Sequence, residues 1–172
     1  MFDSDYKFYG RHAQYAKFLC KDKGEEKEDR SNLFQREVDV LEIAPLIGII
    51  EGRYVPDVDN DVKDASTIQY ATISREHETL LTAYRIVMLS NNVGNYSAKD
   101  KVDMAFKFDS IDDKDNPNMK IFNGYVRGGL EFLYEKFAES TDHEKDKKNW
   151  ICGSIKDLLT NLETSEEYEA NM

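Results

Sequence analysis

The segment Ile43-Ala44-Pro45-Leu46-Ile47-Gly48-Ile49-Ile50 is apolar on every side, and the rest of the fold is expected to cover it. A segment of this kind belongs at the centre of a hydrophobic core. Pro45 has no backbone N–H, and its ring clashes with the preceding turn. This predicts either a kinked continuation of a helix that starts earlier or a new short helix that begins at Pro45. A buried strand would show the same apolar pattern.

On both sides of this segment the apolar residues recur at the three-and-four spacing of α-helices. Ser66 and Gln69, Ser97 and Asp100, and Asn116 followed by Pro117 resemble the starts of helices. The predicted helices run from about Ser4 to Cys20, from Asn32 through the apolar segment, from Ser66 to about residue 90, from Ser97 to Phe106, from Asn116 to Phe137, and from Thr141 and Glu144 onward. No β-hairpin is indicated.

Six to seven helices of this kind predict an all-α protein, a compact single-domain bundle. The domain is expected to span residues 1–162. Lys21 to Arg30 (KDKGEEKEDR) has no apolar side chain to bury, which predicts a charged linker after the first helix. Residues 163–172 are polar and acidic, and a flexible tail is expected there. A chain of 172 residues buries about 70% of its unfolded surface, so it needs no disulfide or metal to fold.

The chain carries 34 acidic and 23 basic residues, a net charge of −11. Binding duplex DNA through its phosphates requires a basic face, so this balance argues against this chain being the main DNA-binding surface of a complex, although it does not forbid a local basic patch. An acidic surface suits a subunit that docks on a basic protein, or a mimic of nucleic acid. The start Met-Phe-Asp-Ser lacks the pattern of a signal peptide, and no apolar run reaches the roughly 18 residues of a membrane span. A cytoplasmic protein, with Cys20 and Cys152 as buried free thiols, is therefore expected.

The acidic segment Asp57–Asp64 is a candidate for metal-dependent chemistry. An EF-hand loop that starts at Asp57 would need glycine and glutamate where this chain has Val62 and Ile68. Pro56-Asp57 and Asp61-Val62-Lys63 resemble a restriction-nuclease signature, but too few residues separate the two halves for them to lie on neighbouring strands. The sequence therefore predicts an acidic loop without a metal, and a metal-dependent hydrolase or nuclease using this loop is the alternative.

The histidines and cysteines do not form an enzyme motif. His77-Glu78 begins like a zinc-protease helix, but Leu81 stands where the second histidine would be needed. His12 lies at the edge of an apolar stripe, which is typical of a hydrogen-bonded structural histidine. Cys152-Gly153-Ser154 has no base nearby in sequence. No catalytic residue, no cofactor and no metal site are predicted.

The segment from Asn123 to Glu131 (NGYVRGGLE) places three glycines within one predicted helix. Each costs about 1 kcal/mol relative to alanine, so something must offset them. One explanation is close packing of another helix against the glycine surface. The other is that two of them admit a partner backbone or a phosphate, with neighbouring side chains and Gly52-Arg53-Tyr54 completing the surface. The second explanation predicts a partner-binding site at Arg53, Tyr125, Arg127, Gly128, Gly129 and Glu131.

Three segments in this order resemble a known family. They are Phe34 to Arg53 (FQREVDVLEIAPLIGIIEGR), Tyr84 to Leu89 (YRIVML) and Ile121 to Glu131 (IFNGYVRGGLE). The chain resembles the small helical accessory proteins that are encoded beside DNA phosphorothioation (Dnd) systems, which modify the host's DNA backbone or restrict invading DNA. The resemblance implies an accessory component of a multi-protein anti-phage system and assigns no catalytic residue.

The leading hypothesis is a non-enzymatic accessory or adaptor subunit of such an anti-phage defence complex, acting through protein–protein binding. Its expected partner is a larger DNA-processing or ATP-hydrolysing subunit of the same system, with nucleic acid contacted at most indirectly and no membrane. A second hypothesis is an acidic DNA mimic that inhibits a nucleic-acid-binding protein. That role requires carboxylates gathered on one face at phosphate-like spacing.

Overall fold

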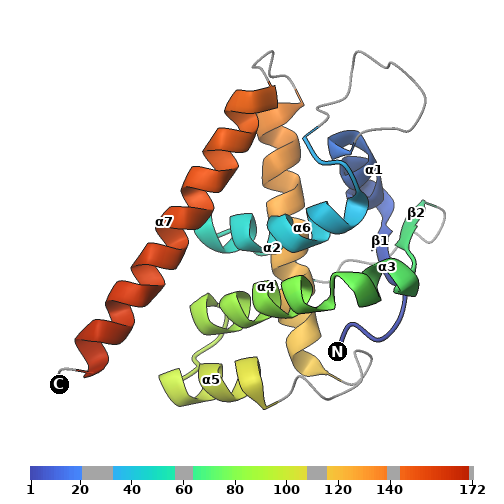
Figure 1. Ribbon diagram of the computed structural model, residues 1–172. Coiled ribbons are helices and arrows are strands. Elements are labelled where there is room, and N and C mark those ends of the chain that lie inside the picture. The colour runs from blue at the N-terminus through green and yellow to red at the C-terminus, as the bar shows by residue number, and fades with distance from the viewer. Residues whose placement is uncertain (21–32, 57–63, 108–115, 139–143, 171–172) are drawn as a thin grey trace.

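The computed structural model describes residues 1–20, 33–56, 64–107, 116–138 and 144–170 of the chain, and for 144–145 and 162–170 it describes the backbone alone. Within these ranges the chain forms seven helices and one two-stranded sheet (Figure 1). The helices are α1 (Gly10–Leu19), α2 (Glu37–Ile50), α3 (Tyr70–Arg75), α4 (His77–Ser90), α5 (Ala98–Phe106), α6 (Pro117–Phe137) and α7 (Glu144–Ala170). The predicted mostly helical, compact architecture is confirmed.

Helices α2 and α6 make the most extensive contact in the molecule and form its centre. The apolar segment is the second half of α2, which continues as one helix from Glu37 to Ile50 with Pro45 inside it. Of the three structures predicted for this segment, the continued helix is the one that forms. No new helix starts at Pro45, and the segment is not a strand. Helices α1, α4 and α7 also pack on this central pair, and α5 packs on α4.

Gly52 ends α2 and redirects the chain across α6. It adopts the left-handed conformation, with a φ of 61°, which suits glycine because it has no Cβ. The backbone N–H of Arg53 then donates to the carbonyl oxygen of Gly48 at 2.8 Å, as in a Schellman motif. Two residues after Arg53, the N–H of Val55 donates to the carbonyl oxygen of Gly124 in α6 at 3.0 Å. The segment 53–55 is therefore fixed against the middle of α6.

The two-stranded sheet corrects the prediction of a helix from Ser4 and of no hairpin. Strand β1 (Tyr6–Tyr9) pairs antiparallel with β2 (Ala65–Ile68), with Phe8 opposite Ser66. The two strands are far apart in sequence, so no local turn signal announces them. Gly10 has a φ of 53° at the junction with α1, and its N–H donates to the carbonyl oxygen of Asp64 at 2.7 Å. The predicted first helix therefore starts only at Gly10.

The predicted helix start at Ser66 is also wrong. Ser66 lies in β2, and its hydroxyl donates to the carboxylate of Glu37 at 2.5–2.6 Å, a contact between distant parts of the chain. The segment that was expected to form one helix is divided at Glu76 into α3 and α4. The prediction failed because a capping-box spacing is a local pattern. In the folded protein the Ser66 hydroxyl is instead used by the hydrogen bond to Glu37, which is distant in sequence.

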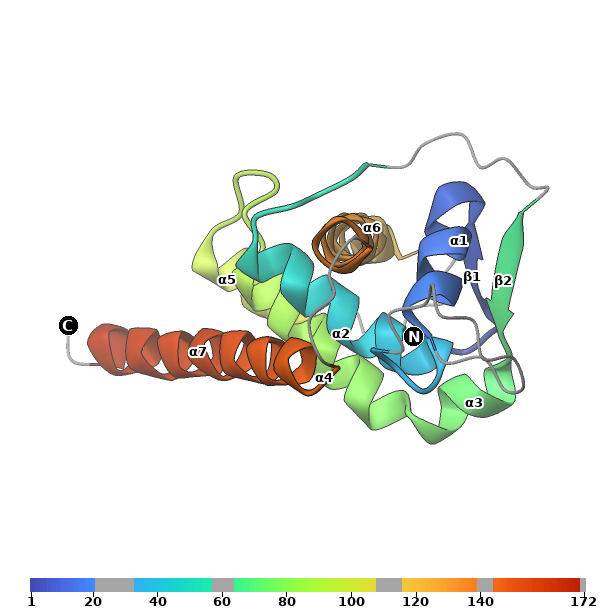
Figure 2. The same ribbon diagram turned by 90° about the horizontal axis from the view of Figure 1, so that it is seen from above.

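Helix α7 lies along one flank, and its C-terminal end points away from the rest of the protein (Figures 1 and 2). Near its start, the Trp150 ring lies 5.9 Å from the Phe132 ring and 6.1 Å from the Phe137 ring of α6. Ile151 is only 5% exposed, whereas Leu159 is 41% exposed. The helix continues to Ala170, through residues 163–170 of the expected tail, whose flexibility stays a prediction. The predicted linker, residues 21–30, and Thr141 lie outside the described residues.

Candidate functional site

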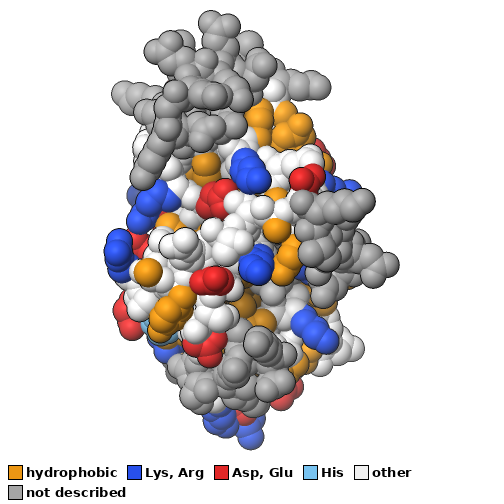
Figure 3. All heavy atoms as spheres, turned by 90° about the vertical axis from the view of Figure 1, so that its right-hand side faces the viewer, with side chains coloured by type: hydrophobic (Ala, Val, Ile, Leu, Met, Phe, Trp, Pro, Cys, Tyr) orange, Lys and Arg blue, Asp and Glu red, His pale blue; other side chains and the backbone are white. Residues whose placement is uncertain are grey.

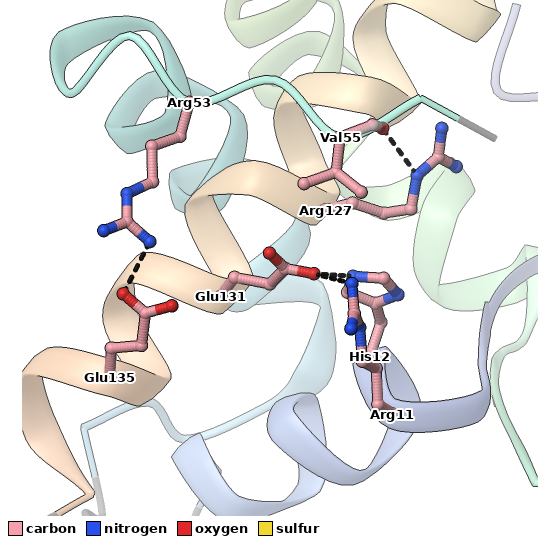
Figure 4. A network of polar contacts seen from close by, with 7 residues as sticks. All are labelled: Arg11, His12, Arg53, Val55, Arg127, Glu131 and Glu135. Carbon is pink, nitrogen blue, oxygen red and sulfur yellow. Dashed lines mark hydrogen bonds and ion pairs between the residues drawn. The ribbon is translucent and has the colours of Figure 1, made fainter. Parts of the chain in front are cut away.

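A group of charged side chains lies on one face of α6, and we call it the α6 charged face. It consists of Arg11 from α1, Arg53 from the segment after α2, and Arg127, Glu131 and Glu135 from α6 (Figure 4). The three α6 residues follow one another at intervals of four, which places them on the same side of the helix. Three segments that are distant in sequence therefore contribute to one surface.

Glu131 is the centre of this face. One of its carboxylate oxygens accepts a hydrogen bond from Arg11 at 2.5 Å and contacts Nε2 of His12 at 3.0 Å (Figure 4). The side chain of Glu131 is 18% exposed, and that of Arg11 is 56% exposed. The guanidinium of Arg11 therefore extends from a partly buried carboxylate toward solvent.

His12 has the structural role that the sequence predicted. It is buried, and burial lowers its pKa, although the hydrogen bond to Glu131 acts in the opposite direction. The imidazole is therefore mostly neutral at pH 7 and acts as a hydrogen-bonding partner of Glu131. The titratable groups of the α6 charged face and His12 are three guanidiniums, two carboxylates and one imidazole.

Arg53 and Arg127 are held in different ways. The guanidinium of Arg53 pairs with Glu135 at 2.5 Å and lies 5.1 Å from the centre of the Phe132 ring, yet its side chain is 40% exposed. Arg127 donates from Nε to the carbonyl oxygen of Val55 at 3.0 Å (Figure 4). The hydrogen bond of Arg127 therefore holds the segment after α2 against α6. The guanidinium of Arg53, although paired with Glu135, remains accessible at the surface.

The glycines of α6 are packed against the chain itself. A Cβ at Gly128 would overlap the carbonyl oxygen of Arg53, and a Cβ at Gly129 would overlap that of Ala44. Gly48 in α2 has the same relation to the carbonyl oxygen of Tyr125. Close helix packing, one of the two explanations left open by the sequence, therefore accounts for these glycines. Their surfaces have no space left for a partner backbone or a phosphate.

Tyr125 is also an interior residue. Its side chain is buried, its hydroxyl accepts a hydrogen bond from the N–H of Asn92 at 3.1 Å, and burial raises its pKa. Of the six residues predicted to bind a partner, the structure brings Arg53, Arg127 and Glu131 together on the α6 charged face. It places Tyr125, Gly128 and Gly129 in the contact beneath.

Arg11 and Glu135 are the members that the sequence prediction missed. Glu135 follows Arg127 and Glu131 at the same interval of four, so the helical spacing alone was sufficient to find it. Arg11 has no such signal, because its contact with Glu131 spans 120 residues and depends on how α1 packs on α6.

The remaining candidates for chemistry that the structure describes are not assembled into a site. Asp57 to Lys63 lie outside the described residues, and the carboxylate of Asp64 accepts a hydrogen bond from Gln14 at 2.9 Å. Among the residues that the structure describes, no three His, Cys, Asp or Glu side chains are grouped as metal ligands. Cys20 is buried as expected, whereas Cys152 is exposed on α7, which corrects the prediction of two buried thiols.

Positive and negative side chains are interspersed on the face shown in Figure 3, with hydrophobic groups between them. On this face the described residues do not form the continuous array of carboxylates that a DNA mimic requires. Comparison with protein-family models, curated proteins and solved structures finds no match to this chain. No helix in the described ranges has the length and apolar character that crossing a bilayer requires.

Proposed function

We propose that this chain is a non-enzymatic accessory subunit that binds a protein partner through the α6 charged face. The resemblance to accessory proteins of DNA phosphorothioation systems supports placing that partner in a bacterial anti-phage complex, as a larger DNA-processing or ATP-hydrolysing subunit. The observation that carries the proposal is the convergence of Arg11, Arg53 and Arg127 from three segments onto one face of α6.

The chemistry of the face favours recognition of carboxylates on a folded partner. A guanidinium offers several N–H donors in a fixed plane, and arginine is enriched in protein–protein interfaces. Arg11 and Arg53 are anchored by Glu131 and Glu135, so their positions are restricted before a partner arrives. Such restriction lowers the entropy lost on binding. In a chain with a net charge of −11, the α6 charged face carries three arginines and two glutamates, one positive charge in excess.

Combining Arg53→Glu with Arg11→Gln is expected to weaken partner binding. Charge reversal at residue 53 would repel carboxylates on the partner, and loss of an interface arginine commonly weakens binding by about tenfold or more. The partner is to be identified by co-expressing the tagged chain with the products of its neighbouring genes. Isothermal titration calorimetry with the purified partner then measures the dissociation constant of each variant.

The matched control is Arg75→Glu, which reverses an exposed arginine on α3, outside the α6 charged face. It should bind like the original protein, and thermal melting followed by circular dichroism checks that all variants remain folded. If the double variant binds as tightly as the control, the α6 charged face is not the interface. If no neighbouring gene product binds the unaltered chain, the accessory role itself is refuted.

A further inference from the structure

A pocket lies between α5 and the first turn of α6, which are both at the lower end of the molecule in Figure 1. Its volume of about 360 Å³ is within the range of sites for small ligands. Its lining combines apolar and polar side chains, namely Met104, Pro117, Ile121, Asp100, Asp103 and Asn118. Tyr96, which precedes α5, lines the same pocket. The polar members decide which class of ligand fits.

Asn118 is the buried polar group of this pocket, and it is only 6% exposed. Its Nδ2 donates to the hydroxyl of Tyr84 at 3.1 Å and to the carbonyl oxygen of Met104 at 3.5 Å. These bonds direct Nδ2 toward the interior, so Oδ1, on the other branch of the planar amide, is the atom that faces the pocket. Among the described residues no N–H or O–H group donates to this oxygen. A buried acceptor without a donor is unfavourable, and a ligand that carries a donor would correct this.

Two carboxylates give the pocket a negative charge. Asp100 and Asp103 are three residues apart on α5, which places them on the same side of the helix. Oδ2 of Asp100 accepts hydrogen bonds from the N–H and the hydroxyl of Ser97 at 3.0 and 2.7 Å, and these bonds lower its pKa and keep it ionised. Asp103 pairs with the exposed Lys107 at 2.7 Å, and exposed pairs of this kind are weak enough for a ligand to displace. The pocket therefore favours a cation.

The start of α6 offers nothing to an anion. Pro117 has no N–H, and the N–H of Asn118 already donates to Oδ1 of Asn116 at 3.0 Å. The N–H of Met119 donates to the carbonyl oxygen of Asn116 at 3.1 Å. A divalent metal is not favoured either, because it requires about six oxygen ligands, and the described residues group no three His, Cys, Asp or Glu side chains as ligands. The class that remains is an organic cation.

Tyr96 and the apolar wall indicate the structure of that cation. The Tyr96 side chain is exposed, so its ring is accessible from the pocket. The face of an aromatic ring attracts an ammonium group. Met104 and Ile121 are buried beneath, and they provide an apolar surface on which a short alkyl chain can lie.

We propose that this pocket binds a primary alkylammonium group. Its three N–H donors match the three acceptors, which are Oδ1 of Asn118 and the carboxylates of Asp100 and Asp103. A free aliphatic amine and a lysine side chain both present this group. Asn118 lies nine residues before Arg127, about 14 Å along α6, so the pocket is separate from the α6 charged face and stands independently of the proposed accessory role.

Butylammonium chloride is expected to bind the full chain with a dissociation constant on the order of 1 mM. A titration at constant ionic strength, followed by ¹H–¹⁵N NMR, should shift the side-chain amide of Asn118 in a saturable way. Butanol has the same alkyl chain without the charge and should bind at least about tenfold more weakly. N-acetyl-lysine methylamide distinguishes the two sources. It should bind as tightly as butylammonium if the pocket admits a lysine side chain, and more weakly if the pocket admits only a free amine.

The variants remove one feature of the pocket at a time. Asp100→Asn combined with Asp103→Asn removes both charges with little change of shape, and it should weaken butylammonium binding about fivefold or more. Tyr96→Leu should weaken it about threefold, because leucine keeps an apolar surface but has no ring. The matched control is Asp146→Asn, at an exposed carboxylate on α7, which should bind like the original protein. The NMR spectra also show that each variant remains folded.

The proposal is overturned if butylammonium causes no saturable shift of the Asn118 amide up to about 50 mM. It is equally overturned if butanol binds as tightly, since the pocket would then recognise only the alkyl chain. Equal binding by the double variant and by Asp146→Asn would show that the carboxylates of α5 are not involved. A tighter response to Mg²⁺ that displaces butylammonium would make the pocket a metal site instead.

Discussion

Gly129→Ala is expected to lower the free energy of unfolding by about 3 kcal/mol or more. The new Cβ would overlap the carbonyl oxygen of Ala44 and would approach the backbone nitrogen of Gly48 to 3.0 Å. Both neighbours are backbone atoms of α2, so no side chain can rotate away. The helices α2 and α6 would have to move apart, which would open the centre of the core. Urea unfolding followed by circular dichroism measures the change.

Gly153→Ala is the matched control. It adds the same methyl group within a helix, but a Cβ at this position of α7 meets no atom within 4 Å. Alanine has the higher helix propensity, so this variant should be as stable as the original or more stable by up to about 1 kcal/mol. Equal unfolding midpoints for the two variants would contradict the packing of Gly129. The same geometry means that Gly129→Leu, at a residue initially predicted to bind a partner, would test folding and not binding.

Glu42→Gln is expected to stabilise the protein above pH 7 by about 2 kcal/mol and to have little effect near pH 4. Burial, together with the charges of Glu76 and Asp39, raises the pKa of Glu42 to about 7. In the unfolded chain this carboxyl ionises near its ordinary pKa of 4.5, while in the folded protein it stays protonated up to about pH 7. The unfolded state therefore binds fewer protons in this interval, and stability falls as the pH rises through it. Glutamine stays neutral and does not lose this stability.

The measurement is chemical denaturation of the original and the variant at about pH 4, 6 and 8, which lie below, within and above the interval between the unfolded and folded pKa values of Glu42. Arg36 already pairs with Asp39 and Glu76, each at 2.6 Å, so it partly screens the two charges that oppose ionisation of Glu42. Glu78→Gln, at a side chain that is 90% exposed on α4, controls for the loss of one negative charge. A stability difference for Glu42→Gln that does not change with pH would refute the shifted pKa.

The helices of this fold were largely predictable because apolar spacing is a local property. The stripe of α6, the capping of α5 by Ser97 and the helix end at Gly52 all depend on residues within a few positions of one another. The two strands were not predictable in this way. Their partner residues, such as Tyr6 and Ile68, are brought together only by the packing of α1 and of the segment before α3.

The candidate site was predicted in part for the same reason. Arg127 and Glu131 share a helix face, and the glycine at position 52 marks the turn that brings Arg53 to them. The role of the α6 glycines was left open by the sequence, because a glycine can admit either a ligand or a neighbouring helix. The structure decides between these two possibilities, because the carbonyl oxygens of Ala44 and Arg53 lie directly against Gly129 and Gly128.

The chain leaves α1 and returns toward α2 at almost the same place. Cys20 and Phe34 form a parallel bridge, and the N–H of Phe34 donates to the carbonyl oxygen of Leu19 at 3.0 Å. Backbone contacts between Leu19–Cys20 and Phe34 thus hold these two points of the chain together. Lengthening a closed loop costs only about 0.6 kcal/mol for each doubling. A fluorescent reporter or an affinity epitope can therefore be inserted between residues 21 and 32, leaving both chain termini and the α6 charged face unmodified.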